Sequence, residues 1–206
     1  MTRPTIEFWY EFSSSYSYLA VMRIEALAGQ AGVDVAWRPF LLGPVFLALG
    51  WNDSPFNIYP PKGRYMWRDL ARLSAKYGLA FRMPGRFPRS GVLAARVALI
   101  GNQGGWVAQF SRAVMSANFA QDRDIGDPAV IMAILADMRL PAEEVLAQAT
   151  SADNKLALRA QTARAAELGL FGAPSFRVGD ELFWGNDRLE DALDWARGAS
   201  APVLPG

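Results

Sequence analysis

Three consecutive serines, Ser13, Ser14 and Ser15, stand where the sequence changes from a strand pattern to a helix pattern. The alternating apolar run over residues 5–12 predicts a strand, and the apolar spacing over residues 16–31 predicts a helix. One serine should be the N-cap of this helix, because its side chain can accept from the free N–H groups of the first turn. A hydroxyl held there can also hydrogen-bond a bound thiolate, since the helix dipole favours negative charge.

The dipeptide Ala173-Pro174 is the second feature with chemical consequences. It lies in the run Phe171-Gly172-Ala173-Pro174-Ser175-Phe176, ahead of a predicted short strand. A cis peptide bond here would turn the N–H and C=O of Ala173 toward a pocket, where they can hold an extended peptide. A trans proline that begins a plain strand is the alternative. The surrounding elements decide between the two.

The composition excludes several classes of function. The chain of 206 residues contains no His and no Cys, so the usual zinc, copper and iron ligands are missing and no metal site is expected. Ser-His-Asp, Cys-His and disulfide-exchange mechanisms are excluded for the same reason, and any reactive sulfur must come from a ligand. A formal charge of +1 gives no general attraction to nucleic acid or to anionic membranes.

The apolar runs also bear on location. No stretch approaches the roughly 20 apolar residues that a membrane helix needs. Met1-Thr2-Arg3-Pro4 leads directly into a strand without the apolar segment of a signal peptide. We therefore expect a cytoplasmic protein.

The order of the predicted elements indicates the fold. Residues 33–40 form a second strand that Pro39 closes, which completes a βαβ unit with parallel strands. Residues 50–63, rich in Gly, Pro and Asn, are expected to be an irregular functional loop. Helical periodicity follows over residues 64–79, 89–120, 128–138, 141–149 and 153–168. A hairpin over residues 175–178 and 181–184 and a helix over residues 187–197 complete the chain.

This order predicts an α/β, thioredoxin-like fold, βαβ and then ββα, with a large helical insertion. Residues 1–45 and 170–206 would form the thioredoxin-like domain, and residues 46–169 the inserted helical domain.

Four blocks of the sequence resemble a known family. The run Glu11-Phe12-Ser13-Ser14-Ser15-Tyr16-Ser17-Tyr18-Leu19-Ala20 resembles the opening of the 2-hydroxychromene-2-carboxylate isomerases, relatives of the kappa-class glutathione transferases and of the DsbA-like oxidoreductases. Residues 37–43, 61–70 and 183–189 look like that family's blocks too, in the same order. Together with Gly172-Ala173-Pro174, the resemblance covers nearly the whole chain.

The resemblance implies that glutathione is the cofactor and that its thiol takes the place of the missing cysteine. Ser14 matches the catalytic serine of the family. Ser15 replaces a proline of the family's motif, so either Ser13 or Ser15 could cap the helix while Ser14 points at the sulfur. Ala173, beside Pro174, matches the residue whose backbone pairs with the cysteinyl part of glutathione.

Asn186 and Asp187 match the pair that receives the γ-glutamyl end of glutathione in this family. Asp187 can pair with the α-ammonium group, and free N–H groups at the start of the last helix can take the α-carboxylate. For these two residues alone, a plain helix N-cap is the alternative. Asn52 and Lys62 also resemble positions that hold glutathione, although a lysine there can equally be a solvated surface charge.

Other residues bear on the substrate. Arg82, Arg86 and Arg89 form either a carboxylate-recognising rim or an ordinary basic surface loop. Several of the isomerases carry a lysine near the substrate, and Leu47 stands at the matching position here. Five aromatic residues either line a substrate pocket or belong to the core: Trp9, Tyr10, Trp51, Tyr59 and Trp67.

The function that the resemblance implies is a glutathione-dependent isomerisation between 2-hydroxychromene-2-carboxylate and trans-o-hydroxybenzylidenepyruvate, in aromatic catabolism. Transient addition of the thiolate turns the double bond into a single bond that can rotate, and elimination returns the cofactor. A kappa-like glutathione transferase and a non-catalytic peptide-binding module are the alternatives. The resemblance also implies a homodimer.

Overall fold

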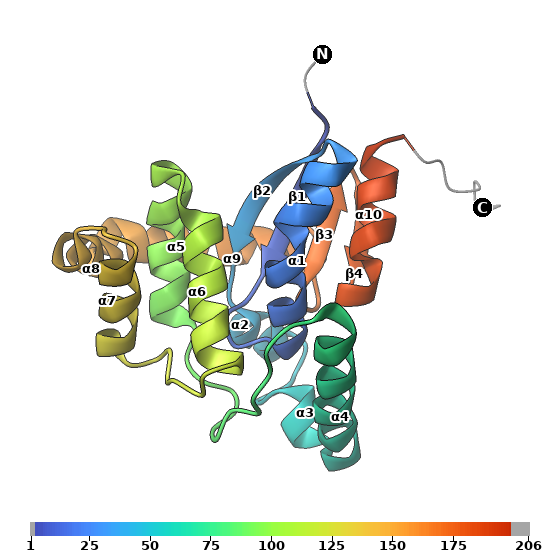
Figure 1. Ribbon diagram of the computed structural model, residues 1–206, viewed down its shortest axis with the longest axis horizontal. Coiled ribbons are helices and arrows are strands. Elements are labelled where there is room, and N and C mark those ends of the chain that lie inside the picture. The colour runs from blue at the N-terminus through green and yellow to red at the C-terminus, as the bar shows by residue number, and fades with distance from the viewer. Residues whose placement is uncertain (1–2, 199–206) are drawn as a thin grey trace.

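The computed structural model describes residues 3–198, in which four strands form one sheet in the order β2-β1-β3-β4. The strands are β1 (Thr5–Tyr10), β2 (Asp34–Pro39), β3 (Ser175–Val178) and β4 (Glu181–Trp184). β1 and β2 are parallel, β3 is antiparallel to β1, and β4 is antiparallel to β3. The N-terminal strands and the C-terminal hairpin therefore meet in one sheet (Figure 1), and the predicted thioredoxin-like fold is confirmed.

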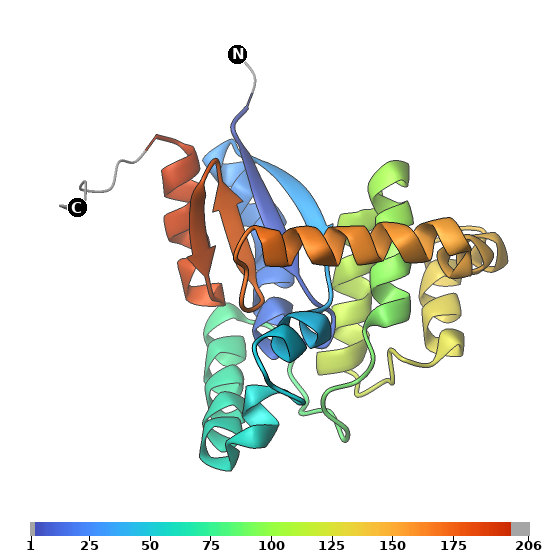
Figure 2. The ribbon, with the colours of Figure 1, turned by 180° about the vertical axis from the view of Figure 1, so that it is seen from behind.

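Helices cover both faces of this sheet. α1 (Ser15–Ala31) and α10 (Leu189–Ala196) lie on one face, and Figure 2 shows α9 (Ala152–Glu167) crossing the other face beside α2 (Leu42–Ala48). The alternation of side chains along β1 serves both layers, because Phe8 and Tyr10 pack toward α1 whereas Trp9 packs toward α2 and α9. Phe8 also stacks on Phe176 of β3, with ring centroids 5.3 Å apart. The sheet that positions the site is thus buried on both sides.

The remaining helices lie between β2 and β3 in the chain: α3 (Pro55–Ile58), α4 (Pro60–Tyr77), α5 (Val92–Gly104), α6 (Val107–Phe119), α7 (Pro128–Asp137) and α8 (Ala142–Thr150). One cluster of buried apolar side chains runs from the sheet into this part, through Phe8, Leu19, Ala98 and Phe110. The thioredoxin-like part and the inserted helical part therefore share one hydrophobic core. Their division into two domains, with residues 46–169 as the insertion, remains a prediction.

Two predictions about these elements were wrong. Residues 50–63 are not irregular throughout, because they contain α3 and the first residues of α4. Ser54 caps α3 by accepting from the N–H of Phe56, and a proline stands in the first turn of both helices, where its missing N–H costs nothing. Residues 89–120 form two helices rather than one, because α5 ends at Gly105 with a left-handed φ of 74°.

Within residues 3–198, none of the helices combines the length and the apolar character that crossing a membrane requires.

Candidate functional site

A cavity of about 1280 Å³ opens where the carboxyl ends of β1 and β2 meet the start of α1. Its walls come from α2, α3, α4, the α4–α5 loop (residues 78–91), residues 171–173 ahead of β3, and the segment from β4 to the following 3-10 helix η1 (Asn186–Arg188). In Figure 1, α3 and α4 lie below the start of α1. Six of the seven predicted site residues line this cavity: Ser14, Asn52, Lys62, Ala173, Asn186 and Asp187. Pro174 is buried directly beside Ala173.

Ser14 connects the two halves of the site by hydrogen bonds. Its extended backbone makes it the N-cap of α1, and its Oγ accepts from the N–H of Ser17 at 3.2 Å. The same hydroxyl donates to the carbonyl oxygen of Ala173 at 3.0 Å. The end of β1 and the start of β3 are therefore joined through one side chain, 159 residues apart in sequence.

The prediction that Ser13 or Ser15 caps the helix was wrong. Ser15 is already the first helical residue, and its hydroxyl contacts the sulfur of Met66 at 3.1 Å. Ser13 donates to the carbonyl oxygen of Arg89 in the α4–α5 loop. Both side chains are thus engaged with α4 and its following loop, and only Ser14 sits at the position from which a side chain reaches the first turn.

The backbone around Ala173 is fixed on both sides. The Ala173-Pro174 peptide bond is cis. The carbonyl oxygen of Pro174 accepts from the N–H of Gly185 at 2.9 Å, which ties the start of β3 to the end of β4. The indole of Trp184 lies so close to Gly172 that an added Cβ would be 2.3 Å from its Nε1. The carbonyl of Ala173 is therefore held in place, facing Ser14.

Asn186 lines the cavity and has a buried amide donor without a partner among residues 3–198. The residue is only 2% exposed, and its Oδ1 accepts from Nη1 of Arg23 at 3.1 Å. Its Nδ2 is buried and has no hydrogen-bond partner within the described residues. Because Arg23 donates to Oδ1, the NH₂ group is the side of this amide that lacks a partner in the described part of the chain.

The neighbouring Asp187 is exposed at the cavity edge, where its carboxylate accepts from Arg188 at 3.0 Å. Gly185 precedes the pair with a φ of 110°, and a Cβ there would lie 2.5 Å from Oδ1 of Asp187. Neither Asn186 nor Asp187 is an N-cap, since Gly185 holds that place for η1 and Arg188 for α10. The alternative that Asn186 and Asp187 only cap the last helix is thus excluded.

The outer wall of the cavity carries exposed residues from α2 to α4. Asn52 and Lys62 both line it, and Nζ of Lys62 lies 5.7 Å from the ring centroid of Phe56. Leu47 also lines it and is 71% exposed. Trp51 is the one residue of the five predicted aromatics that lines this cavity, because Trp9 and Tyr10 are buried in the core. Tyr59 and Trp67 lie outside its wall.

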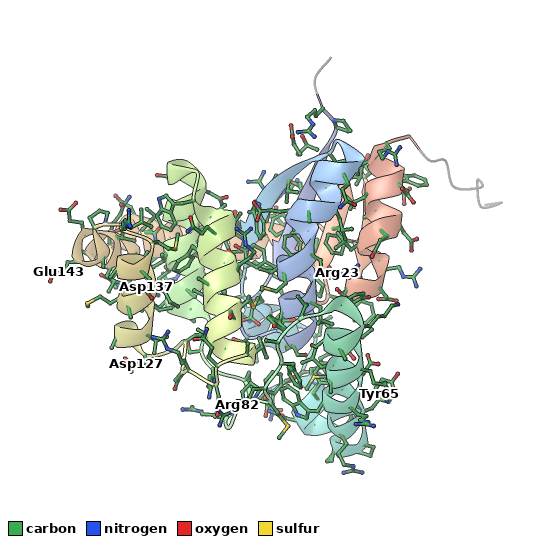
Figure 3. The ribbon with its side chains drawn as sticks, in the orientation of Figure 1. Arg23, Tyr65, Arg82, Asp127, Asp137 and Glu143 are labelled. Atoms are coloured by element: carbon green, nitrogen blue, oxygen red, sulfur yellow. The ribbon has the colours of Figure 1, made fainter. Side chains whose placement is uncertain are left out.

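The three arginines of the α4–α5 loop have different surroundings. Arg86 is exposed and lines the cavity, whereas Arg82, which Figure 3 places on this loop, is exposed outside it. Arg89 is 8% exposed, and its guanidinium group donates to Asp122 and to the carbonyl oxygen of Arg123. The alternative of an ordinary surface loop is therefore wrong for Arg89, which holds the loop against the end of α6.

The sequence analysis missed Glu11. This residue follows β1, is 9% exposed and lines the cavity beside the serines. Burial raises the pKa of its carboxyl to about 7, with hydrogen bonds from Ser13 acting in the opposite direction. A carboxyl group directly after a strand and beside the serines was the signal available in the sequence.

The phenol of Tyr16 lines the same wall. Burial and a hydrogen bond to Asp69, at 3.0 Å, raise the pKa of Tyr16, so this phenol stays protonated at neutral pH. Residues 3–198 contain no group of three or more acidic side chains placed to hold a metal ion.

Comparison with known proteins agrees with this fold. The family model of the DSBA-like thioredoxin domain matches residues 5–194. A 2-hydroxychromene-2-carboxylate isomerase of Sphingobium xenophagum is 31% identical over 187 residues, which cover 90% of this chain and 94% of the relative. A solved structure of a 2-hydroxychromene-2-carboxylate isomerase superposes with a TM-score of 0.83 at 25% identity, covering 94% of each chain.

A further relative, glutathione s-transferase kappa 2 of Caenorhabditis elegans, is 24% identical over 208 residues, covering 94% of this chain and 92% of the relative. These relatives are isomerases and a transferase, which supports an enzymatic function. Within the DSBA-like thioredoxin domains, the chain belongs to the 2-hydroxychromene-2-carboxylate isomerase family.

Proposed function

We propose that this protein is a glutathione-dependent isomerase that interconverts 2-hydroxychromene-2-carboxylate and trans-o-hydroxybenzylidenepyruvate, with Ser14 acting on the glutathione sulfur. The observation that carries the proposal is the meeting of Ser14, the Ala173 carbonyl and the unpartnered amide of Asn186 in one cavity. The named isomerase relatives support the reaction class, and the kappa-class relative supports the cofactor.

The cavity residues fit glutathione. A buried donor without a partner costs about 1–3 kcal/mol, so the Nδ2 of Asn186 calls for an acceptor such as the α-carboxylate of the tripeptide. The exposed carboxylate of Asp187 suits the α-ammonium group, and Lys62 with Asn52 suits the glycyl end. The volume exceeds the roughly 300–1,000 Å³ of a usual small-ligand site, which leaves room for a substrate beside the cofactor.

When bound, glutathione would supply a thiolate that adds reversibly to a conjugated double bond. The hydroxyl hydrogen of Ser14 is engaged by the carbonyl of Ala173, which can accept an N–H of the tripeptide instead. Ser14 then becomes free to donate to the sulfur. This donor and the N-terminus of α1 both favour negative charge at that point, so they lower the pKa of a thiol held there.

The substrate part of the cavity is apolar. Phe46, Trp51, Phe56 and Phe87 contribute to its wall, which suits an aromatic substrate, and Arg86 adds a cation for a carboxylate. Leu47 stands where several family members carry a lysine. This difference and the kappa-class relative favour a second candidate, a glutathione transferase, which needs the same nucleophile but leaves it attached to the electrophile.

Two measurements test the proposal in order. Isothermal titration calorimetry of the protein with glutathione should show binding, and no binding would favour a non-catalytic peptide-binding module. Incubation with glutathione and 2-hydroxychromene-2-carboxylate should then yield trans-o-hydroxybenzylidenepyruvate, with all glutathione recovered unchanged. A covalent glutathione conjugate as the main product would instead identify a transferase.

A homodimer and a cytoplasmic location, where glutathione is kept reduced, belong to the same proposal. Light scattering of the purified protein should give twice the mass of one chain, and a monomer would remove the dimer from the proposal.

A further inference from the structure

Glu11 places a carboxyl group in the wall of the cavity that holds Ser14. Its own carbonyl oxygen accepts from the N–H of Ser14 at 3.0 Å, so both residues belong to one tight turn at the end of β1. Oε1 also borders the α4–α5 loop, since a Cβ added to Gly91 would lie 3.1 Å from it. The carboxyl group is therefore fixed from two sides, between the serine turn and a loop that lines the same cavity.

This carboxyl group has no cation to compensate its charge. Burial is the main influence on its pKa and Ser13 acts in the opposite direction, whereas no charged neighbour contributes within the described residues. Eight other titratable or charged groups share the cavity wall, from α1, the α2–α3 segment, α4, the α4–α5 loop and η1: Tyr16, Asp53, Lys62, Tyr65, Asp69, Arg86, Arg89 and Asp187. The guanidinium group of Arg89 is bound to Asp122 and to carbonyl oxygens, and Asp69 is bound to Tyr16 and Arg72.

An unpaired buried carboxyl group disfavours the folded state once it is ionised, so packing alone does not explain it. Groups of this kind are concentrated at sites that move protons. A carboxyl with a pKa near 7 is also a better match to a thiol, whose ordinary pKa is about 8.5, than a solvated glutamate with a pKa of about 4.3.

Building on the proposed function, we propose that Glu11 accepts the proton of the glutathione thiol and holds it while the sulfur is ionised. The S–H bond breaks with its electron pair left on the sulfur, and an O–H bond forms on the Glu11 carboxylate. Together, the Glu11 carboxyl group and the thiol carry one negative charge before and after the transfer. A carboxylate and a thiolate therefore never stand side by side. Glu11 returns the proton when the thiol is restored. Ser14 and Glu11 thus divide the work, with Ser14 donating to the sulfur and Glu11 holding its proton.

The test compares the wild-type protein with Glu11→Gln, which keeps the shape of the side chain but removes the basic carboxylate. Both proteins are titrated with glutathione at about pH 8, above the pKa of Glu11, which is about 7, and below that of a free thiol. Ultraviolet absorbance measures the thiolate, and calorimetry in two buffers of different ionisation enthalpy counts the protons released. Asp69→Asn serves as the matched control, because it removes another carboxylate from the same wall.

In the wild type and in Asp69→Asn, thiolate should form without net release of a proton to the buffer. In Glu11→Gln, each thiolate formed should release one proton to the buffer, because the carboxylate that would hold this proton is gone. A Glu11→Gln protein that binds glutathione and forms thiolate with the wild-type proton count would overturn the role of Glu11 while leaving the proposed function intact. Absence of glutathione binding in the wild type would overturn the proposed function itself.

A measurement on the wild type alone covers the case in which Glu11→Gln fails to fold. In protein labelled with ¹³C-glutamate, glutathione should produce the infrared band of a protonated carboxyl group at about pH 8, above the pKa of Glu11. S-methylglutathione, which has no thiol proton to give, should bind without this band. An unchanged carboxyl spectrum on saturation with glutathione would exclude the transfer.

Discussion

At the scale of single residues, Ser14 makes two hydrogen bonds with different consequences. The bond that it accepts from Ser17 stabilises the start of α1, and the bond that it donates to Ala173 keeps the hydroxyl within the cavity. Replacing this side chain should therefore change stability slightly and catalysis strongly.

Ser14→Ala should lower the isomerase activity roughly 10- to 100-fold, because a hydrogen bond to a charged group contributes about 1.5–3 kcal/mol. It should also lower the free energy of unfolding by about 1 kcal/mol through loss of the N-cap. Steady-state kinetics and denaturant titration measure the two effects. Ser15→Ala is the control, since it loses only the contact with Met66 and leaves the cap in place. Full activity in Ser14→Ala would remove this residue from the mechanism.

Glu11 should also make stability depend on pH, whatever the reaction is. Its pKa is about 7 in the folded chain against an ordinary value of 4.5, so the unfolded chain loses this proton first. The free energy of unfolding should therefore fall as the pH rises from about 4.5 to 7, and remain lower above that range. The rise of the pKa from 4.5 to about 7 corresponds to a change of roughly 3 kcal/mol in the free energy of unfolding, at 1.36 kcal/mol for each pH unit.

Denaturant unfolding of the wild type and Glu11→Gln at several pH values measures this contribution. The variant should gain stability relative to the wild type between pH 4.5 and 7, the ordinary and the folded pKa of Glu11. Parallel stability curves would show that Glu11 ionises normally in the folded chain.

At the scale of elements, the site depends on the meeting of α1, β3 and η1 at one end of the sheet. The existence of α1 and β3 was predictable, because apolar periodicity over residues 5–31 and 175–184 is a local signal. The separate turn η1 was not distinguished from the helix predicted over residues 187–197. The first residues of α4 were missed because prolines in that segment suggested a loop, whereas Pro60 begins the helix. Contacts between distant elements, such as the hydrogen bond from Arg23 to Asn186, have no local signal in the sequence.

Arg23 is a positioning residue for Asn186, on the opposite side from the cavity. Figure 3 shows it between α1 and α10, where it also pairs with Glu190 and lies 3.7 Å from the ring centroid of Tyr77. Arg23→Ala should let the amide of Asn186 turn over. The dissociation constant for glutathione should rise roughly three- to tenfold, as expected for one hydrogen bond of about 0.5–1.5 kcal/mol.

Calorimetry with glutathione measures this effect, and kcat at saturating glutathione should stay near the wild-type value. Glu190→Gln is the control, because it removes the ion pair of Arg23 but keeps the bond between Arg23 and Asn186. A fall in kcat without any change in affinity would contradict the positioning role.

At the scale of the whole molecule, the cavity wall is tied to the helical part through Asp122. The carboxylate of Asp122 accepts from the N–H of Gly85 at 2.9 Å and from Arg89, and Arg82 lies 3.9 Å away. The side-chain amide of Asn118, near the end of α6, donates to the carbonyl oxygen of Phe12 at 3.1 Å. The α4–α5 loop and the serine turn are therefore anchored to the end of α6 and the residues that follow it.

Asp122→Asn should lower the melting temperature at neutral pH, because the loop loses a charged acceptor. The bond from Gly85 and then that from Arg89 hold the pKa of Asp122 below its ordinary value, so the carboxylate stabilises the fold above about pH 4. This contribution is lost as the pH falls through the lowered pKa. Asn also tolerates the positive φ of 56° at this position.

Thermal unfolding of both proteins between neutral pH and about pH 2 checks this prediction. The difference in melting temperature should shrink toward zero at the acid end. A constant difference over the whole range would show that the charge of Asp122 is not responsible.

The sequence by itself determined the fold class, and six of the seven residues that it predicts for a site line one cavity. Apolar periodicity identifies strands and helices, and the serine turn, Ala173-Pro174 and Asn186-Asp187 are short motifs whose meaning is local. Only the tertiary structure decided that Ser14 is the cap, that Arg89 is buried, that Nδ2 of Asn186 has no partner and that Glu11 is desolvated. The reason is that burial and the choice of hydrogen-bond partner depend on groups far away in the chain, which come together only when it folds.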